Sequence, residues 1–141
     1  MAVRTFMTFE SLSSTPRSLE AEDPPAGRDL ALLFASGIQE RGLTIQEPVS
    51  QHDSYGWYFV AVSAEQPVWC MLQWSGEWLL ITKPELPLLR RLFGGKANDA
   101  GHRAVCAAIH ETARAHPDIT SVKWFAEDEY GVPDAGAETP V

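Results

Sequence analysis

The sequence predicts an α+β fold, in which a mainly antiparallel sheet of about five strands carries two main helices packed on one face. Two segments have apolar residues at helical spacing, one from Arg28 to Arg41 and one from about Asn98 to His116. An aromatic, extended run lies between them. Because two amphipathic helices can cover only one face of a sheet this size, a two-layer arrangement is expected.

The first helix is predicted from a stripe of apolar positions at i, i+3, i+4, i+7 and i+8, which are Leu30, Leu33, Phe34, Gly37 and Ile38. Gly42 supplies its C-terminal stop. A glycine inside a helix costs about 1 kcal/mol relative to alanine. We therefore expect Gly37, on the apolar stripe, to let the helix approach the sheet closely.

The second long helix is capped by Asn98 or Asp99 and ends before Pro117, which cannot continue a helix. A short helical turn is expected just before it, from Leu88 to Phe93. The strands are predicted from alternation and turn residues, with a further extended segment that starts at Leu43 and is closed by Pro48. The five predicted strands are Val3–Phe9, Trp57–Val62, Val68–Trp74, Glu77–Thr82 and Ser121–Phe125.

The central run from Tyr55 to Lys83 holds four of the five tryptophans and is apolar on both faces. If Ser75-Gly76 is a two-residue hairpin loop, Gln73 pairs with Trp78. One face then carries Cys70, Leu72, Leu79 and Ile81, and the other carries Trp69, Met71, Trp78 and Leu80. Ser-Gly is not the strongest pair for such a turn, so a longer loop with a shifted register stays open. A sheet that is apolar on both sides needs something to cover its second face.

Composition narrows the classes of partner. The 141 residues fit a single domain, expected over residues 1–130, with a flexible C-terminal tail over 131–141. The formal net charge of −8 argues against nucleic acid, whose binding depends on Lys and Arg. No apolar run has the length of a membrane span or a signal peptide, so a cytoplasmic protein with no membrane partner is expected. Cys70 and Cys106 lie among apolar neighbours and are expected to be buried free thiols.

No motif indicates catalysis, a cofactor or a metal. His110 and His116 are six residues apart, whereas two histidines that bind zinc from one helix face are four apart. Gly94-Gly95-Lys96 lacks the glycine spacing and the following Ser or Thr of a phosphate loop. We therefore expect no catalytic residues, no metal site and no cofactor.

Three stretches of sequence carry a resemblance, namely His52-Asp53-Ser54-Tyr55-Gly56-Trp57, Leu89-Arg90-Arg91-Leu92-Phe93-Gly94 and Val122-Lys123-Trp124-Phe125. Together with the long helix, they resemble a group of small bacterial single-domain proteins of unassigned function, with a look found among immunity and antitoxin-like proteins. The resemblance implies a bacterial, cytoplasmic α+β domain and carries no activity with it.

The leading hypothesis is a non-enzymatic, acidic protein-binding domain, immunity or antitoxin-like, that uses an aromatic sheet face to bind a basic protein or a second copy of itself. An interface combines a central aromatic cluster with a polar rim. The candidate binding residues are Trp57, Trp69, Met71 and Trp78 beside Asp53, Glu65 and Glu77. The alternative is a small-molecule-binding protein or small enzyme with a pocket between helices and sheet, lined by Trp57, Tyr58, Trp124, His52 and Asp53.

Overall fold

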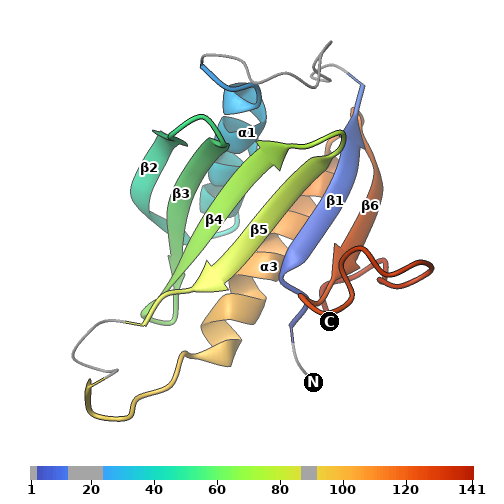
Figure 1. Ribbon diagram of the computed structural model, residues 1–141. Coiled ribbons are helices and arrows are strands. Elements are labelled where there is room, and N and C mark those ends of the chain that lie inside the picture. The colour runs from blue at the N-terminus through green and yellow to red at the C-terminus, as the bar shows by residue number, and fades with distance from the viewer. Residues whose placement is uncertain (1–2, 13–23, 87–91) are drawn as a thin grey trace.

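A computed structural model describes residues 3–12, 24–86 and 92–141 and contains one six-stranded antiparallel sheet with two helices on one of its faces (Figure 1). The sheet order is β2-β3-β4-β5-β1-β6. The helices are α1 (Arg28–Glu40) and α3 (Asp99–Ala115), and the strands are β1 (Phe6–Ser11), β2 (Thr44–His52), β3 (Gly56–Ser63), β4 (Gln66–Trp74), β5 (Trp78–Pro84) and β6 (Ile119–Phe125). The predicted α+β class is confirmed, with six strands instead of about five.

The sixth strand arises because the extended segment after α1 does not close at Pro48. β2 runs on to His52, with register shifts against β3 between Ile45 and Glu47 and between Glu47 and Ser50. Proline lacks the N–H that a ladder needs and is therefore confined to edge strands and bulges. β2 is the edge strand of the sheet, so it accommodates Pro48.

The loop between β3 and β4 is shorter than the sequence indicated. Ser63 pairs with Gln66, which leaves Ala64 and Glu65 as a two-residue loop. Both take left-handed backbone angles, with φ of 50° and 63°. Two consecutive left-handed residues form the type I′ turn, whose twist matches the flanking strands.

The loop between β4 and β5 is longer than a Ser75-Gly76 turn. Trp74 pairs with Trp78, which leaves three loop residues, with Gly76 in the left-handed region at φ 88°. The expected Gln73–Trp78 register is therefore wrong by one residue, and the shifted register that stayed open is the one observed. Since successive side chains of a strand point to opposite faces, the shift moves Trp78 to the same face as Leu72.

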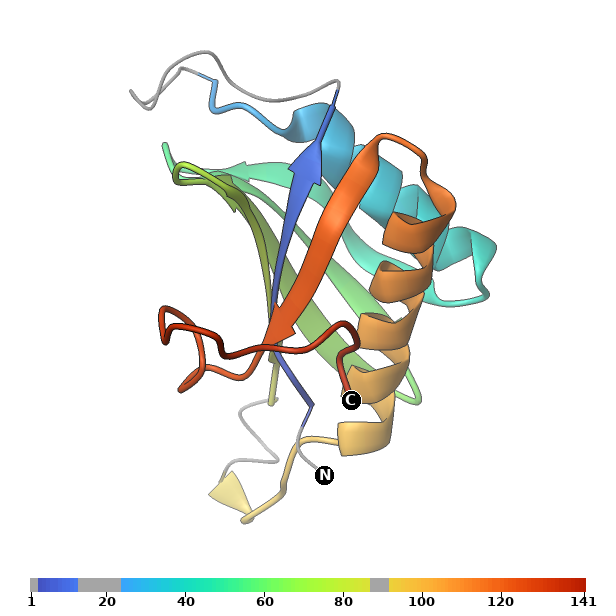
Figure 2. The same cartoon turned by 90° about the vertical axis from the view of Figure 1, so that its right-hand side faces the viewer.

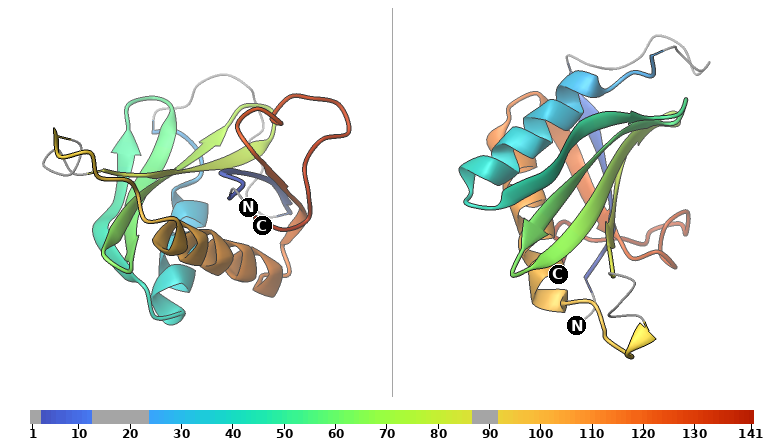
Figure 3. Two further views of the ribbon diagram at one scale, coloured as in Figure 1. Left: turned by 90° about the horizontal axis from the view of Figure 1, so that it is seen from below. Right: turned by 90° about the vertical axis from the view of Figure 1, so that its left-hand side faces the viewer.

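The core lies between the helices and the helix-facing side of the sheet. Figure 3 shows both helices on the same side of the sheet in two views. The largest buried side chains there include Phe34 from α1, Phe59 from β3, Trp78 from β5 and Trp124 from β6, all with no exposed surface. α3 begins at the predicted cap, where the Asn98 side chain accepts hydrogen bonds from the Ala100 and Gly101 amides.

Gly37 serves a different contact from the one expected. A methyl group added at its Cα would lie 2.3 Å from the Cγ2 and Oγ1 atoms of Thr112 on α3. The glycine therefore lets the two helices approach each other, and the expectation of a close approach to the sheet is corrected.

Two further segments complete the fold. Residues 131–141, expected to be a flexible tail, run back toward β6 and β1, where Ala137 forms an antiparallel bridge with Trp124 and the Pro140 carbonyl accepts a hydrogen bond from the Arg4 amide at 2.8 Å. Their flexibility stays a prediction. The short helical turn expected at Leu88–Phe93 lies mostly outside the described residues. Among the residues that are described, no helix combines the length and apolarity needed to cross a bilayer.

Candidate interaction surface

The face of the sheet opposite the helices, here called the outer face, is also largely apolar. Its residues alternate along each strand with those of the helix-facing core, as the strand pairings require. Its apolar members include Phe6, Tyr58, Val60, Val62, Pro67, Trp69, Met71, Leu79, Ile81 and Phe125, of which Val60, Met71 and Leu79 are buried. No helix of the described chain covers this side, so the second apolar face inferred from the sequence is present (Figure 3).

The C-terminal segment, residues 126–141, leaves β6 in a loop that covers the β1 and β6 part of the outer face, and it then pairs along the β6 edge at Ala137. Its loop projects from the sheet on the side away from the helices, as two perpendicular views show (Figures 1 and 2). The Tyr130 ring packs edge-on against Phe6 and Phe125, with centroids 5.4 and 5.7 Å away. Its hydroxyl donates to the Glu77 carboxylate at 3.1 Å. Burial, followed by this carboxylate, raises the pKa of Tyr130.

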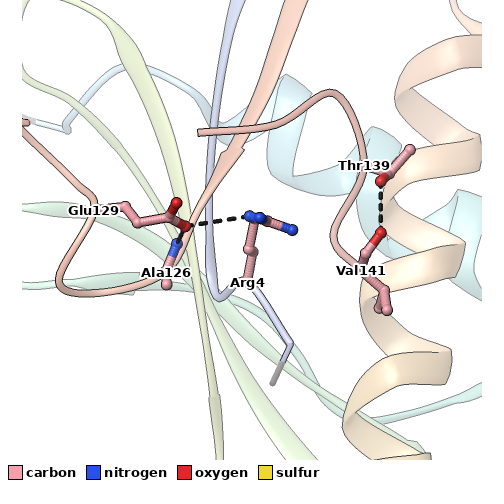
Figure 4. A network of polar contacts seen from close by, with 5 residues as sticks. All are labelled: Arg4, Ala126, Glu129, Thr139 and Val141. Carbon is pink, nitrogen blue, oxygen red and sulfur yellow. Dashed lines mark hydrogen bonds and ion pairs between the residues drawn. The ribbon is translucent and has the colours of Figure 1, made fainter. Parts of the chain in front are cut away.

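Backbone and charged contacts hold this segment in place. The Glu129 carboxylate accepts from the Ala126 amide at 2.8 Å and pairs with the Arg4 guanidinium at 3.2 Å (Figure 4). The Ala126 amide, with Arg4 in support, lowers the pKa of Glu129. Near the end of the chain, the Thr139 hydroxyl donates to the Val141 carbonyl at 2.7 Å. A polypeptide segment thus already packs on one part of the outer face.

The other part of the outer face, on β2, β3 and β4, carries an aromatic cluster of His52, Tyr55, Tyr58 and Trp69. The His52 ring lies at its centre, 5.7 Å from Trp69, 5.8 Å from Tyr58 and 6.1 Å from Tyr55. Tyr55 is 64% exposed, and the other three are half-buried. Such edge-on and tilted packing is the arrangement that aromatic quadrupoles favour. The four rings therefore form one connected cluster.

Beside this cluster runs a groove of about 820 Å³. Its walls come from β2, the start of β4 and the end of β5, and its lining residues are Gln46, His52, Pro67, Trp69, Lys83, Pro84, Glu85 and Leu86. Trp69 pairs directly with Lys83 across β4 and β5. The Glu85 amide donates to the Pro67 carbonyl at 2.9 Å, which places Glu85 one ladder step further along the same wall.

The charge around the groove is mainly negative within the described part of the chain. Glu85 lines the groove. Three exposed carboxylates lie close in sequence to lining residues: Glu47 follows Gln46, Asp53 follows His52, and Glu65 lies two residues before Pro67. We call these four residues the acidic rim. Lys83 is the cation in the lining. Because the rim is solvent-exposed, its effect on a partner is mainly on encounter and orientation.

The structure separates the residues that the sequence grouped into one binding surface. Trp69 and Met71 lie on the outer face, whereas Trp57 and Trp78 lie in the helix-facing core. The Trp57 indole N–H donates to the Pro25 carbonyl at 2.8 Å within that core. The side chains of Trp69 and Met71 therefore project from one face of the sheet, and those of Trp57 and Trp78 project from the other.

The two acidic candidates also lie at different places. Asp53 is exposed in the turn after His52, next to the aromatic cluster, and takes a left-handed backbone with φ 47°. Glu77, in the β4–β5 loop, holds the Tyr130 hydroxyl. Asp53 thus lies in the turn next to the groove residue His52, and Glu77 borders the area covered by the C-terminal segment.

The residues of the alternative pocket do not come together either. Trp57 and Trp124 are buried on the helix-facing side, while Tyr58 and His52 belong to the outer face. The Trp124 indole donates to His110 Nδ1 at 3.1 Å, so His110 has a structural partner. The described residues hold no group of three or more His, Cys, Asp or Glu side chains placed to bind a metal ion.

One buried polar cluster lies beneath β5 and could be mistaken for a reactive site. The Thr82 hydroxyl lies 2.9 Å from His102 Nε2 and 3.4 Å from Cys106 Sγ. Burial raises the pKa of Cys106 to about 12 and lowers the pKa of His102. The nucleophile of cysteine chemistry is the thiolate, and the raised pKa of Cys106 keeps this side chain mainly a thiol at neutral pH.

Sequence reasoning missed the groove residues Pro67, Lys83 and Glu85. No local pattern marks them, because they become neighbours of Trp69 only through the pairing of β4 with β5. The sequence shows Tyr55 and Tyr58 as aromatic residues at the start of a predicted strand. Their contact with His52 depends on the turn that joins β2 to β3.

Comparison with known proteins gives no family. No protein-family model matches the chain, and no curated protein or solved structure matches it either. The fold and the outer face define an α+β protein with a two-sided apolar sheet, and a function for it has to be argued from the surface itself.

Proposed function

We propose that this protein is a non-enzymatic binding domain that docks a basic protein partner on the outer face of its sheet. The observation that carries the proposal is the aromatic cluster of His52, Tyr55, Tyr58 and Trp69 beside an open groove. Aromatic residues are enriched at the energetic centres of protein interfaces. Here they lie on the sheet face that none of the described helices covers.

The covered part of the outer face supports a polypeptide as the occupant. The C-terminal segment packs there through one aromatic side chain, Tyr130, and one ion pair, Glu129 with Arg4. The same surface chemistry continues into the uncovered part, where rings lie beside carboxylates. A partner segment would find apolar area flanked by hydrogen-bonding and charged groups, which is the composition of interface cores and rims.

The charge of the molecule supports a basic partner. The chain carries a formal net charge of −8, and the acidic rim combines Glu85 in the groove lining with three carboxylates within two residues of that lining, against Lys83. Complementary charge speeds encounter and suppresses wrong partners. An immunity or antitoxin-like protein that blocks a basic partner is one instance of such a domain.

Capture from the native cell with matched variants tests this proposal. Wild type, Trp69→Ala and Leu32→Ala are immobilised in parallel, and captured proteins are compared by mass spectrometry. Leu32 is 39% exposed on α1, on the other side of the molecule, and serves as the control for loss of an apolar side chain. We expect a basic protein to be retained by wild type and Leu32→Ala and lost with Trp69→Ala.

Hydrogen exchange then locates the contact. Binding of the captured protein should slow exchange in β2, β3 and β4 and leave α1 unaffected. Capture that survives Trp69→Ala, or protection that falls on the helices, would contradict the proposal. A monodisperse dimer in light scattering that loses its mass with Trp69→Ala would instead identify a second copy as the partner.

A small-molecule site is the second candidate, and the groove is the observation that favours it. Its volume of about 820 Å³ falls within the range of ligand pockets, about 300–1,000 Å³. Because Trp69 lines it, a bound ligand would change tryptophan fluorescence. Titration with a metabolite panel, repeated with Trp69→Phe, tests this function; quenching that is lost in the variant supports it.

A further inference from the structure

We infer that the groove between β2, β4 and β5 receives an arginine side chain of the basic partner, with its guanidinium laid against Trp69 and within reach of Glu85. The inference rests on the proposed function and names the chemical group that the groove selects. Trp69 and Glu85 line the same groove. They supply the two things a guanidinium binds, an aromatic ring and a carboxylate.

The spacing of the two groups fits one side chain. Glu85 is joined to Pro67 by the 2.9 Å hydrogen bond, and Pro67 is two residues before Trp69 on β4. Two residues along a strand cover about 7 Å, and both side chains point to the same face. A guanidinium on the indole therefore comes within hydrogen-bonding reach of a flexible glutamate side chain. Among the residues that the structure describes, the Glu85 carboxylate has no ion-pair partner.

Arginine fits this groove better than lysine. The guanidinium is planar, stacks on aromatic faces and can bind a carboxylate through two parallel N–H groups. An ammonium is a compact, strongly hydrated charge that gains less from a ring. The groove is open, and Trp69 in its lining offers a planar ring that suits a planar group.

Lys83 is the one lining residue that opposes a cation, and it makes the inference testable. It pairs directly with Trp69 across the two strands and is exposed. Its removal should strengthen the binding of arginine. Lys123 provides the matched control. It carries the same charge on the same face of the sheet, but it lies over Phe125 on β6, at the edge of the sheet away from the groove.

Three peptides with the repeat Gly-Arg, Gly-Lys or Gly-citrulline, each four repeats long and blocked at both ends, serve as probes in an NMR titration of the full chain. Citrulline keeps the planar shape of arginine and lacks its charge. We expect the arginine peptide to bind about threefold more tightly than the lysine peptide and about tenfold more tightly than the citrulline peptide. The Trp69 indole N–H and the Glu85 amide should shift most.

Variants assign the two contacts. Trp69→Leu and Glu85→Gln should each weaken the arginine peptide about threefold or more, and Lys83→Gln should strengthen it by a similar factor. Glu40→Gln, at the end of α1, and Lys123→Gln make the same charge changes away from the groove and should alter affinity by less than half as much. Circular dichroism of each variant confirms the fold.

The outcomes separate this inference from the proposed function. If both cationic peptides bind the outer face with equal affinity, or if Glu40→Gln matches Glu85→Gln, the arginine site is refuted while a basic partner stands. If Lys83→Gln weakens binding of the arginine peptide, Lys83 does not oppose a bound cation and the arginine site is also refuted. If neither cationic peptide shifts any outer-face signal, the arginine site and the basic-partner proposal fail together.

Discussion

The register of β4 with β5 decides which tryptophan is buried in the helix-facing core. Replacing Trp78 and Trp69 by alanine, one at a time, and comparing the loss of unfolding free energy tests this register. Trp78 has no exposed surface. Its ring centroid lies 6.3 Å from that of Phe9, on which it is stacked, and 5.2 Å from that of Trp74. Loss of a fully buried tryptophan side chain costs about 3–5 kcal/mol of unfolding free energy, because contacts are lost and a cavity remains. Trp69 is half-buried on the outer face, and its loss should cost about 1 kcal/mol.

Urea denaturation followed by far-UV circular dichroism tests this difference, since that signal does not depend on the indole removed. With a slope of about 2 kcal/mol per molar urea, Trp78→Ala should lower the midpoint by about 2 M and Trp69→Ala by about 0.5 M. A Trp78 variant with no cooperative transition would agree with the larger cost. Equal shifts, or a larger shift for Trp69→Ala, would refute the three-residue loop and place Trp78 on the outer face.

Three further changes probe other contacts. Gly37→Ala should lower the unfolding free energy by about 1–2 kcal/mol in thermal or urea denaturation, because overpacking against Thr112 exceeds the gain in helix propensity. Burial lowers the pKa of His102, so as the pH falls the imidazole is protonated in the unfolded chain before it is protonated in the folded one. The unfolding free energy should therefore fall as the pH drops below about 6.5. His102→Gln should reduce this pH dependence in urea titrations at several pH values. Tyr130→Ala should uncover Phe6 and increase the fluorescence of a bound hydrophobic dye at unchanged secondary structure.

Each of these has an outcome that would count against it. The double variant Gly37→Ala, Thr112→Ala should recover part of the lost stability, and no recovery would argue against the contact. A pH slope that is identical in wild type and His102→Gln would remove the imidazole from the acid response. Unchanged dye fluorescence with Tyr130→Ala would show that the C-terminal segment does not shield the outer face.

The helices and most strands follow directly from local sequence. The stripe from Leu30 to Ile38 and the Asn98 cap are local signals, and the structure shows both. Apolar spacing and capping depend on residues within a few positions, which the sequence displays. Pro48 misled because its effect depends on whether its strand lies at an edge, a property of the whole sheet.

The sequence predicted that the sheet has a second apolar face, but it did not predict correctly all of the residues on that face. The second apolar face follows from the composition of the central strands, and Trp69 and Met71 were placed on it. Trp78 was grouped with them because a two-residue turn was the expectation for Ser75-Gly76. One additional loop residue reverses the face of every side chain in β5. Turn length is set by backbone energetics over a few residues, so a small difference there changes the whole surface.

The residues of the groove could not be predicted before the register was known. Lys83 and Glu85 are ordinary charged residues at a strand end, and their role depends on lying opposite Trp69 and Pro67. The C-terminal segment was also unforeseen as a cover for the outer face, since its Gly, Pro and Ala content resembles that of a tail. Its attachment comes from Tyr130 and the bridge at Ala137, which are long-range contacts.

The indole N–H signals of the five tryptophans test the central claim most directly, which is that the outer face, and not the helix-facing core, meets the partner. The protein is labelled with ¹⁵N and titrated with the partner recovered by capture. The account predicts that the Trp69 signal shifts or broadens, while Trp57, Trp78 and Trp124 keep their positions. Shifts confined to those three core indoles, with Trp69 unmoved, would contradict it.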